Sequence, residues 1–276
     1  MTADELFEDT PPFIVHARER VGSTSDEAKT LARNGAPHGT VVWARSQSAG
    51  RGRGGRTWYS PVGNLYASVV LRPAVPFEHL SEVGFVAALG VAEAVRTFLP
   101  AQRCVGLKWP NDVLIDGAKV AGILLESETA RDTAPWVVVG IGINVAAAPS
   151  DAPYPVASLH ASGAPDAIPR RVLSATLGAL GAWFALWREC GFERVRDAWL
   201  RQAAYLQAEV CVRAGEGTVR GRFAGLDDDG AMIVETAQGR RRVSFGDVAL
   251  VHGGGTGYGS AKSGTGSPSS LARAKT

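Results

Sequence analysis

Four short apolar runs between residues 105 and 145 constrain the fold more than any other feature of the sequence. They read VGLKW, DVLI, KVAGILLES and WVVVGIGINV. The second and third are separated by Asp116-Gly117, a dipeptide typical of two-residue β-hairpin turns. Runs of this length bounded by turn residues are typical of strands. The pattern predicts consecutive antiparallel strands joined by short turns.

Further strands and helices are expected on both sides of these runs. β-Branched and apolar stretches predict strands at residues 13–21, 40–46 and 65–73. Apolar residues at near-helical spacing predict a long core helix over 79–98, and two helical segments over 169–204 that are broken at Gly191. The stretch 146–168 is rich in Ala, Pro and Ser and is expected to be a loop.

The pattern changes after about Gln207, which divides the chain. Short β runs separated by Gly and Asp turns predict a small all-β barrel, near the lower size limit for independent folding. The last residues are rich in Gly and Ser and carry too little apolar surface to order themselves. We therefore expect a main domain at 13–206, a small β domain at 207–252 and a disordered tail at 253–276.

Charge and cysteine content exclude several classes of protein. The formal net charge is +2, but Lys262, Arg273 and Lys275 lie in a tail without acids, so the rest is near −1. Charge alone therefore does not indicate a nucleic-acid partner. The three cysteines are far apart and form neither a disulfide framework nor a CxxC pair. No apolar run approaches the ~20 residues of a membrane span, and the acidic N-terminus has no signal-peptide pattern. A cytoplasmic protein without a membrane partner is expected.

The segment from Gly50 to Arg56, GRGRGGR, is the strongest candidate for a ligand loop. Its glycines let backbone amides approach a ligand, and its three arginines suit carboxylates and phosphates. An anion held by a closing loop is expected; a flexible basic surface loop or an RGG-like RNA-binding segment is the alternative. A dinucleotide fingerprint is disfavoured because a strand follows instead of a helix, and no kinase motifs accompany the loop.

Two further segments place polar side chains where strands begin. In KWPND, Pro110 stiffens a corner at which Asn111 and Asp112 can point into a cleft, where the carboxylate could hold Mg²⁺. Asn and Asp are also ordinary turn residues. In KVAGIL, Lys119 opens a buried strand and could neutralise a reacting phosphate or carboxylate. A solvated strand end is the alternative for Lys119. Gly122 inside the same strand indicates close approach of a ligand or another backbone.

The remaining candidates flank these segments. In GIGIN, alternating glycines thin one face of a strand and Asn144 can present its amide at a cleft, or the glycines can serve tight packing alone. In GSTSD, Ser23, Thr24 and Ser25 offer caps for a helix that is expected to end at Gly35. The same hydroxyls could bond a polar ligand.

Together, GSTS, QSAGRGRGGRTW, KWPNDV, KVAGILLE and GIGINV resemble, in order and spacing, the biotin protein ligase family. The resemblance covers roughly residues 14–150 with specific motifs, and the C-terminal segment more loosely. It implies an α+β fold related to class II aminoacyl-tRNA synthetases and lipoate ligases. In that fold a central mixed or antiparallel sheet is flanked by helices and followed by a small SH3-like β-barrel.

The resemblance also implies roles for single residues. Ser23, Thr24 and Ser25 resemble the segment that contacts biotin, although the family usually has Asn in place of Ser25. Gln47 resembles the contact to the ureido group of biotin. The expected core of the adenylate-binding loop consists of Gly50, Arg51, Gly52 and Arg53. Gly54 stands where many members carry another Arg, which lowers the charge of the loop.

Four residues are expected further along the nucleotide. Trp58 resembles the tryptophan at the adenine end, and Asn144 a cleft asparagine near the nucleotide. Lys119 resembles the lysine that contacts the biotin carboxylate and the α-phosphate, with Gly122 beside it. Lys119 and Arg53 are the expected catalytic residues, and Asp112 the expected metal ligand.

The implied reaction uses biotin, ATP and Mg²⁺ and modifies a lysine of a biotin carboxyl carrier protein or domain. A monomer or homodimer without specific DNA binding is expected, because only about a dozen residues precede the first strand. A lipoate or octanoate ligase on the same fold is the rival enzyme. A nucleic-acid-binding module that uses the arginine-rich loop is the rival from another class.

Overall fold

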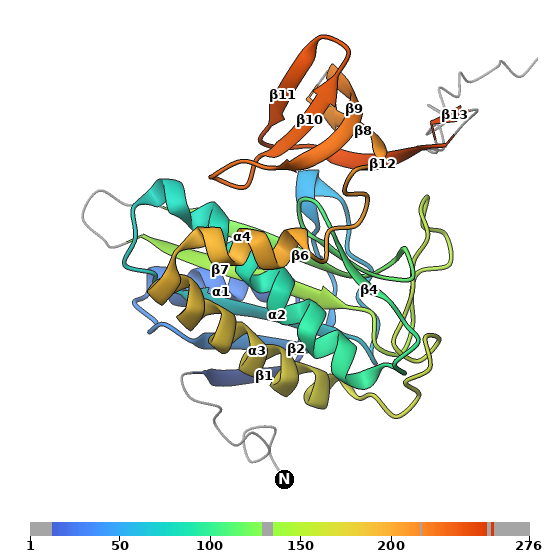
Figure 1. Ribbon diagram of the computed structural model, residues 1–276. Helices are drawn as coiled ribbons and strands as arrows, with labels where there is room; N and C mark the ends of the chain where they lie inside the picture. Colours follow the sequence, from blue (N-terminus) through green and yellow to red (C-terminus); the bar gives the residue numbers. More distant parts are fainter. Residues whose placement is uncertain (1–12, 129–134, 216, 253–254, 257–276) are drawn as a thin grey trace, which may run out of the picture.

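A computed structural model describes residues 13–128, 135–215, 217–252 and 255–256, and a seven-stranded mixed sheet is at its centre (Figure 1). The strands lie in the order β1-β2-β3-β7-β6-β5-β4. Their bounds are β1 Ile14–Val21, β2 Thr40–Gln47, β3 Leu65–Leu71, β4 Val105–Lys108, β5 Asp112–Ile115, β6 Ala118–Glu128 and β7 Trp136–Ile143. Only β1 and β2 run parallel; all other pairs are antiparallel. The predicted succession β4 to β7 is confirmed.

Helices cover both faces of this sheet because its central strands are apolar on both sides. In β3 every residue is buried. Val69 packs in the core with α2 (Val83–Phe98) and α3 (Pro169–Cys190), and Val70 packs beneath α1 (Thr24–Arg33). Successive side chains of a strand point to opposite faces, so neighbouring valines serve the two layers.

The helices follow the sequence expectations, with one correction. A 3₁₀ turn, Phe77–Glu82, precedes α2, and α3 gives way to α4 (Phe192–Leu200) at Gly191. Gly35 has φ +85° just after α1, as expected of a glycine that ends a helix. The predicted side-chain cap of α1 is wrong. Ser23 stands at the N-cap without a side-chain cap bond, and the hydroxyls of Thr24 and Ser25 bond to side chains of the sheet.

The small C-terminal domain is an open antiparallel sheet, not the closed barrel that the sequence predicted. Its strands lie in the order β11-β10-β9-β8-β12-β13. Closure requires the two edge strands, β11 and β13, to pair. Within the described residues, β11 pairs only with β10, and the two-residue β13 pairs only with β12. The bounds are β8 Glu209–Ala214, β9 Gly217–Leu226, β10 Met232–Thr236, β11 Gly239–Val243, β12 Asp247–His252 and β13 Gly255–Thr256.

The small sheet shares one hydrophobic core with the main domain. Phe223 and Val234 of the sheet belong to the same buried cluster as Leu89 of α2. Trp109 Nε1 donates to Gly230 O at 3.0 Å, across the boundary. The predicted tail lies outside the described residues apart from Gly255–Thr256. No helix in the described part of the chain is long and apolar enough to cross a membrane.

Candidate active site

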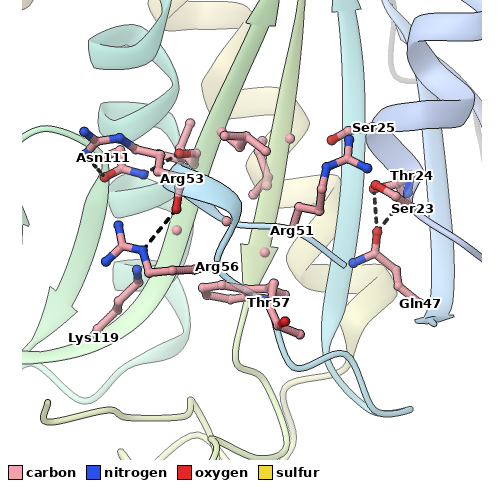
Figure 2. A pocket seen from close by; sticks show the side chains of 18 of the residues that line it. Ser23, Thr24, Ser25, Gln47, Arg51, Arg53, Arg56, Thr57, Asn111 and Lys119 are labelled. Atoms are coloured by element: carbon pink, nitrogen blue, oxygen red, sulfur yellow. Dashed lines mark hydrogen bonds between the residues drawn. The ribbon is translucent and has the colours of Figure 1, made fainter. Parts of the chain in front are cut away.

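A cavity opens where the first turn of α1, the arginine-rich loop and strands β6 and β7 meet (Figure 2). Ten of the predicted site residues line it: Ser23, Thr24, Ser25, Gln47, Arg51, Gly52, Arg53, Trp58, Lys119 and Gly122. Arg56, Asn111 and Tyr154 join them. The free space is only about 60 Å³. The arginine-rich loop forms one wall of this space.

Amide and hydroxyl groups form the polar end of the cavity. Gln47 Oε1 accepts from the backbone N–H of Thr24 at 2.8 Å and from its hydroxyl at 3.1 Å. Ser68 Oγ lies 2.8 Å from Thr24 Oγ1 and 3.1 Å from Ser25 Oγ. Gln47 Nε2 donates to Ser60 Oγ at 3.0 Å. These bonds fix a ring of donors and acceptors suited to a neutral polar ligand group.

Glycines form the floor, and the ring of Trp58 lies on them. A methyl group at Gly142 would be 2.5–2.8 Å from Trp58 ring atoms, and one at Gly122 would be 3.0 Å from the same ring. Gly140 is as confined, at 2.7 Å from Ser25 Oγ. Trp58 Nε1 is buried and has no hydrogen-bond partner among the described residues. The sequence predicted a ligand or another backbone close to Gly122; in the structure the Trp58 side chain is what lies close to it.

The loop turns tightly and its glycines have distinct tasks. Arg51 and Thr57 form an isolated β-bridge at the base of the loop, and Arg53–Gly55 form a 3₁₀ turn with Gly54 at φ +63°. Gly50 does not line the cavity. A methyl group there would lie 2.5 Å from Ser60 Oγ and 2.7 Å from Trp58 O. Only glycine fits this crossing point.

Two of the loop arginines contact the C-terminal sheet. Arg53 donates to Asn111 Oδ1 at 3.1 Å and to Gly246 O at 3.3 Å. Arg56 donates to Asp247 Oδ1 at 3.0 Å. Burial lowers the pKa of Arg53, and the nearby Asp247 carboxylate opposes that shift. The guanidinium remains charged, because an arginine is not deprotonated in proteins.

Lys119 stands at the junction of two cavities. Its ammonium lies 2.6 Å from Asp112 Oδ1, 5.3 Å from the centre of the Trp58 ring and 5.7 Å from that of Tyr154. A second cavity of about 350 Å³ shares Thr57, Trp58, Lys119 and Tyr154 with the first. Asn144 lines this second cavity and donates to Ala157 O at 3.1 Å. Its amide N–H therefore holds the backbone of Ala157, in the Ala/Pro-rich stretch beside this cavity.

The sequence analysis placed Asn111 at a corner from which it could point into a cleft, and the structure brings it to the cavity. It did not single out Arg56 or Tyr154. Arg56 lies inside the arginine-rich motif, so its position was available, but nothing distinguished it from its neighbours. Tyr154 comes from the Ala/Pro-rich stretch, where no periodicity indicates direction. Only the folding of that stretch over β6, through the bridge Lys119↔Val156, brings it to the site.

Comparison with known proteins identifies the family. Residues 18–144 match the model of the biotin/lipoate A/B protein ligase family, and residues 208–251 match that of the biotin protein ligase C-terminal domain. A biotin–[acetyl-CoA-carboxylase] ligase from Paracoccus denitrificans is 38% identical over 234 residues, which cover 83% of this chain and 97% of that protein. The chain belongs to the biotin protein ligase family.

Two other members of the biotin protein ligase family show the same extent of likeness. A bifunctional ligase/repressor from Bacillus subtilis is 34% identical, over 83% of this chain and 72% of its own length. The structure of the biotin protein ligase from Aquifex aeolicus in complex with biotin and ATP superimposes with a TM-score of 0.73. It is 31% identical and covers 86% of this chain and 98% of that one.

Proposed function

We propose that this protein activates biotin with ATP, forming biotinyl-5′-AMP and pyrophosphate, and then transfers biotin to a lysine of a biotin carboxyl carrier protein or domain. The observation that carries the proposal is the position of Lys119 between the two cavities, with ten predicted site residues around the first. A cation at such a junction can serve a reaction between two bound substrates.

Biotin is assigned to the first cavity. Its ureido group needs donors and acceptors, which Gln47, Thr24 and Ser25 supply in a fixed arrangement. Its carboxylate then points toward Lys119. The adenosine of ATP is assigned to the second cavity, where Trp58, Tyr154 and Asn144 form the walls. A flat base suits a pocket with aromatic walls and a few polar groups.

The first step joins the two substrates. A carboxylate oxygen of biotin attacks the α-phosphorus of ATP, the bond to the bridging oxygen breaks, and pyrophosphate leaves. Negative charge gathers at the α-phosphate, and Lys119 and Arg53 offset it as fixed cations. In the second step the neutral amine of the acceptor lysine attacks the acyl carbon. AMP leaves with the electron pair of the broken C–O bond, and the amine proton is lost to solvent. The loop 50–58 excludes water from the anhydride until then.

Mg²⁺ fits this site chiefly through the phosphates. Among the described residues, no group of three or more His, Cys, Asp or Glu side chains is close enough to hold a metal ion. Asp112 can supply one carboxylate oxygen while its Oδ1 faces Lys119. Mg²⁺ commonly takes one or two protein carboxylates, with phosphate oxygens and water as the rest. The ion would neutralise phosphate charge during the first step.

Several finer points belong to the same proposal. The relatives named above are biotin ligases, which favours biotin over lipoate as the acid. We propose a cytoplasmic enzyme, monomeric or homodimeric, that does not bind a specific operator. A shifted band with operator DNA in a mobility assay at physiological salt would contradict the last point.

Biotin-dependent exchange of labelled pyrophosphate into ATP tests the function directly. Purified protein with Mg²⁺ should catalyse the exchange with biotin and not with lipoate or octanoate. Transfer is then followed with a carrier domain and with a variant of it in which the acceptor lysine is replaced. Exchange with lipoate alone would assign the rival acid, and no exchange with any acid would overturn the ligase assignment.

A further inference from the structure

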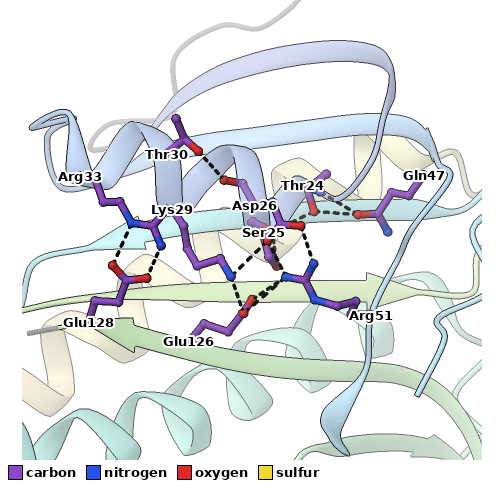
Figure 3. A network of polar contacts seen from close by, with 11 residues as sticks. Thr24, Ser25, Asp26, Lys29, Thr30, Arg33, Gln47, Arg51, Glu126 and Glu128 are labelled. Carbon is purple, nitrogen blue, oxygen red and sulfur yellow. Dashed lines mark hydrogen bonds and ion pairs between the residues drawn. The ribbon is translucent and has the colours of Figure 1, made fainter. Parts of the chain in front are cut away.

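Four charged side chains form an alternating ring beside the cavity (Figure 3). Asp26 and Lys29 lie one turn apart on α1, Glu126 lies on β6, and Arg51 belongs to the loop. Lys29 Nζ is 2.6 Å from Glu126 Oε1 and 3.1 Å from Asp26 Oδ1. Arg51 donates to both oxygens of Asp26, at 2.7 Å to Oδ1, and reaches Glu126 Oε1 at 3.4 Å. The four formal charges sum to zero.

The ring is more than a set of surface pairs. The side chains of Lys29 and Glu126 are only 16% and 24% exposed. The bond from Arg51 lowers the pKa of Asp26 to about 2, so this carboxylate is charged at any working pH. A bidentate arginine–carboxylate contact fixes the orientation of the guanidinium as well as its distance from the carboxylate. Networks of this kind hold geometry better than isolated exposed pairs.

The position of the ring makes it relevant to the loop. Arg51 is the residue whose bridge to Thr57 forms the base of the loop 50–58. Its guanidinium points toward α1 and β6, as Figure 3 shows. α1 and β6, which also line the cavity, therefore hold one end of the arginine-rich loop through Asp26 and Glu126. For Arg53, farther along the loop, the nearest carboxylate paired with it among the described residues is Asp247, at 4.0 Å.

We propose that Asp26 and Glu126 are positioning residues, which hold Arg51 so that the base of the loop is set before biotin binds. The consequence for catalysis rests on the proposed function; the consequence for loop mobility does not. A set loop base favours ground and transition states alike, so its loss should raise KM and leave kcat nearly unchanged.

Limited proteolysis measures the loop without any substrate. Trypsin can cut after Arg51, Arg53 and Arg56, and intact-mass analysis identifies these cuts. In Asp26→Asn they should appear about tenfold faster than in the wild type, equivalent to ~1.4 kcal/mol of lost restraint. Glu27→Gln is the matched control. It removes a neighbouring charge from the same first turn, but Glu27 pairs with Arg18 and not with the loop.

Steady-state exchange supplies the second readout. Asp26→Asn and Glu126→Gln should each raise KM for biotin about tenfold with kcat within twofold. Because both carboxylates hold the same arginine, the double variant should raise KM by less than the product of the two single increases. Glu128→Gln breaks only the Arg33 pair on the same strand and should match the wild type. Asp26→Glu, which keeps the carboxylate, should raise KM for biotin much less than Asp26→Asn does.

The outcomes separate the two proposals. If trypsin cuts the loop of Asp26→Asn and Glu27→Gln at the same rate, and the two variants have the same KM for biotin, the positioning role is overturned. If the wild type shows no exchange with biotin, the ligase assignment fails, and the cleavage rates still decide the role of the ring. A fall in kcat with unchanged KM would also contradict positioning before binding.

Discussion

Lys119 reaches Asp112 at 2.6 Å because the ladder between β5 and β6 contains a bulge. The register runs Asp112↔Gly122 and Val113↔Ala121, then shifts to Leu114↔Lys119, which leaves Val120 as an extra residue. In a regular strand, Lys119 and Gly122 would point to opposite faces. The bulge turns Lys119 to the face that Gly122 lines, where its ammonium lies between the carboxylate and the Trp58 ring.

Replacement of Lys119 should remove the main cation at the reacting phosphate. In Lys119→Ala we expect biotin-dependent exchange to fall about 10²–10³-fold, the usual cost of losing one preorganised donor. Initial rates at saturating ATP and biotin measure this effect, and circular dichroism checks that the variant folds. Lys29→Ala, which removes a lysine of the ion-pair ring beside the cavity, should retain kcat. A loss below tenfold for Lys119→Ala would contradict the assigned role.

Asp112→Asn tests both tasks assigned to that carboxylate. The variant should lower exchange about tenfold and raise the Mg²⁺ concentration at half-maximal rate, because one charged oxygen is lost next to the phosphates. Titration of Mg²⁺ at fixed ATP gives both values. An unchanged half-saturation with lowered kcat would show that Asp112 only orients Lys119. Wild-type values for both would leave it without a role in the reaction.

The contact between Arg56 and Asp247 should tie ATP binding to the C-terminal sheet. Both side chains are about half exposed, so their pair is worth at most ~1 kcal/mol. We expect Asp247→Asn to raise KM for ATP by up to about fivefold, and the difference from the wild type to shrink at high salt. Asp228→Asn, which breaks an exposed pair with Arg196 at the same domain boundary, should leave KM unchanged. Equal effects of the two variants would contradict the link.

The sequence predicts the local elements well where short-range chemistry decides the outcome. The turn at Asp116-Gly117 has φ +49° and +84°, as its two residues indicate. Ten of the site residues gather because their motifs lie at strand and helix ends. The open C-terminal sheet and the bulge at Val120 depend on pairings between distant segments, which no local pattern encodes. The ring around Arg51 was missed for the same reason, since 75 residues separate Arg51 from Glu126.

Two Gly→Ala substitutions should show whether the space above the cavity floor matters for substrate binding. In Gly142→Ala the new methyl would lie 2.5–2.8 Å from the Trp58 ring, which must then shift away from the floor. We expect about tenfold weaker substrate binding, measured as KM for ATP and biotin, with little change in melting temperature. In Gly178→Ala the methyl meets open space on α3, so stability should rise by ~0.5–1 kcal/mol and activity should not change. Normal KM values for Gly142→Ala would show that the ring position is unimportant.

The pair of His79 and Glu82 should make stability fall as pH rises above neutrality. His79 Nδ1 lies 2.5 Å from Glu82 Oε1, and the buried Glu82 also accepts from Trp187 Nε1 at 2.7 Å. The bond to Glu82 raises the pKa of His79, so the folded state binds this proton more tightly than the unfolded chain does. The contribution is full below the unfolded pKa of ~6.5 and is lost as pH rises through the folded value.

Urea unfolding at pH 6.5, 7.25 and 8 measures this slope, and His79→Gln should flatten it. Burial lowers the pKa of His38, so that residue acts in the opposite direction and only as pH falls toward and below its unfolded value. Above pH 6.5 the opposing contribution of His38 is therefore small. Because the side chain of His79 is half exposed, the effect should be well under 1 kcal/mol. An identical slope in wild type and His79→Gln would show that the pair does not contribute.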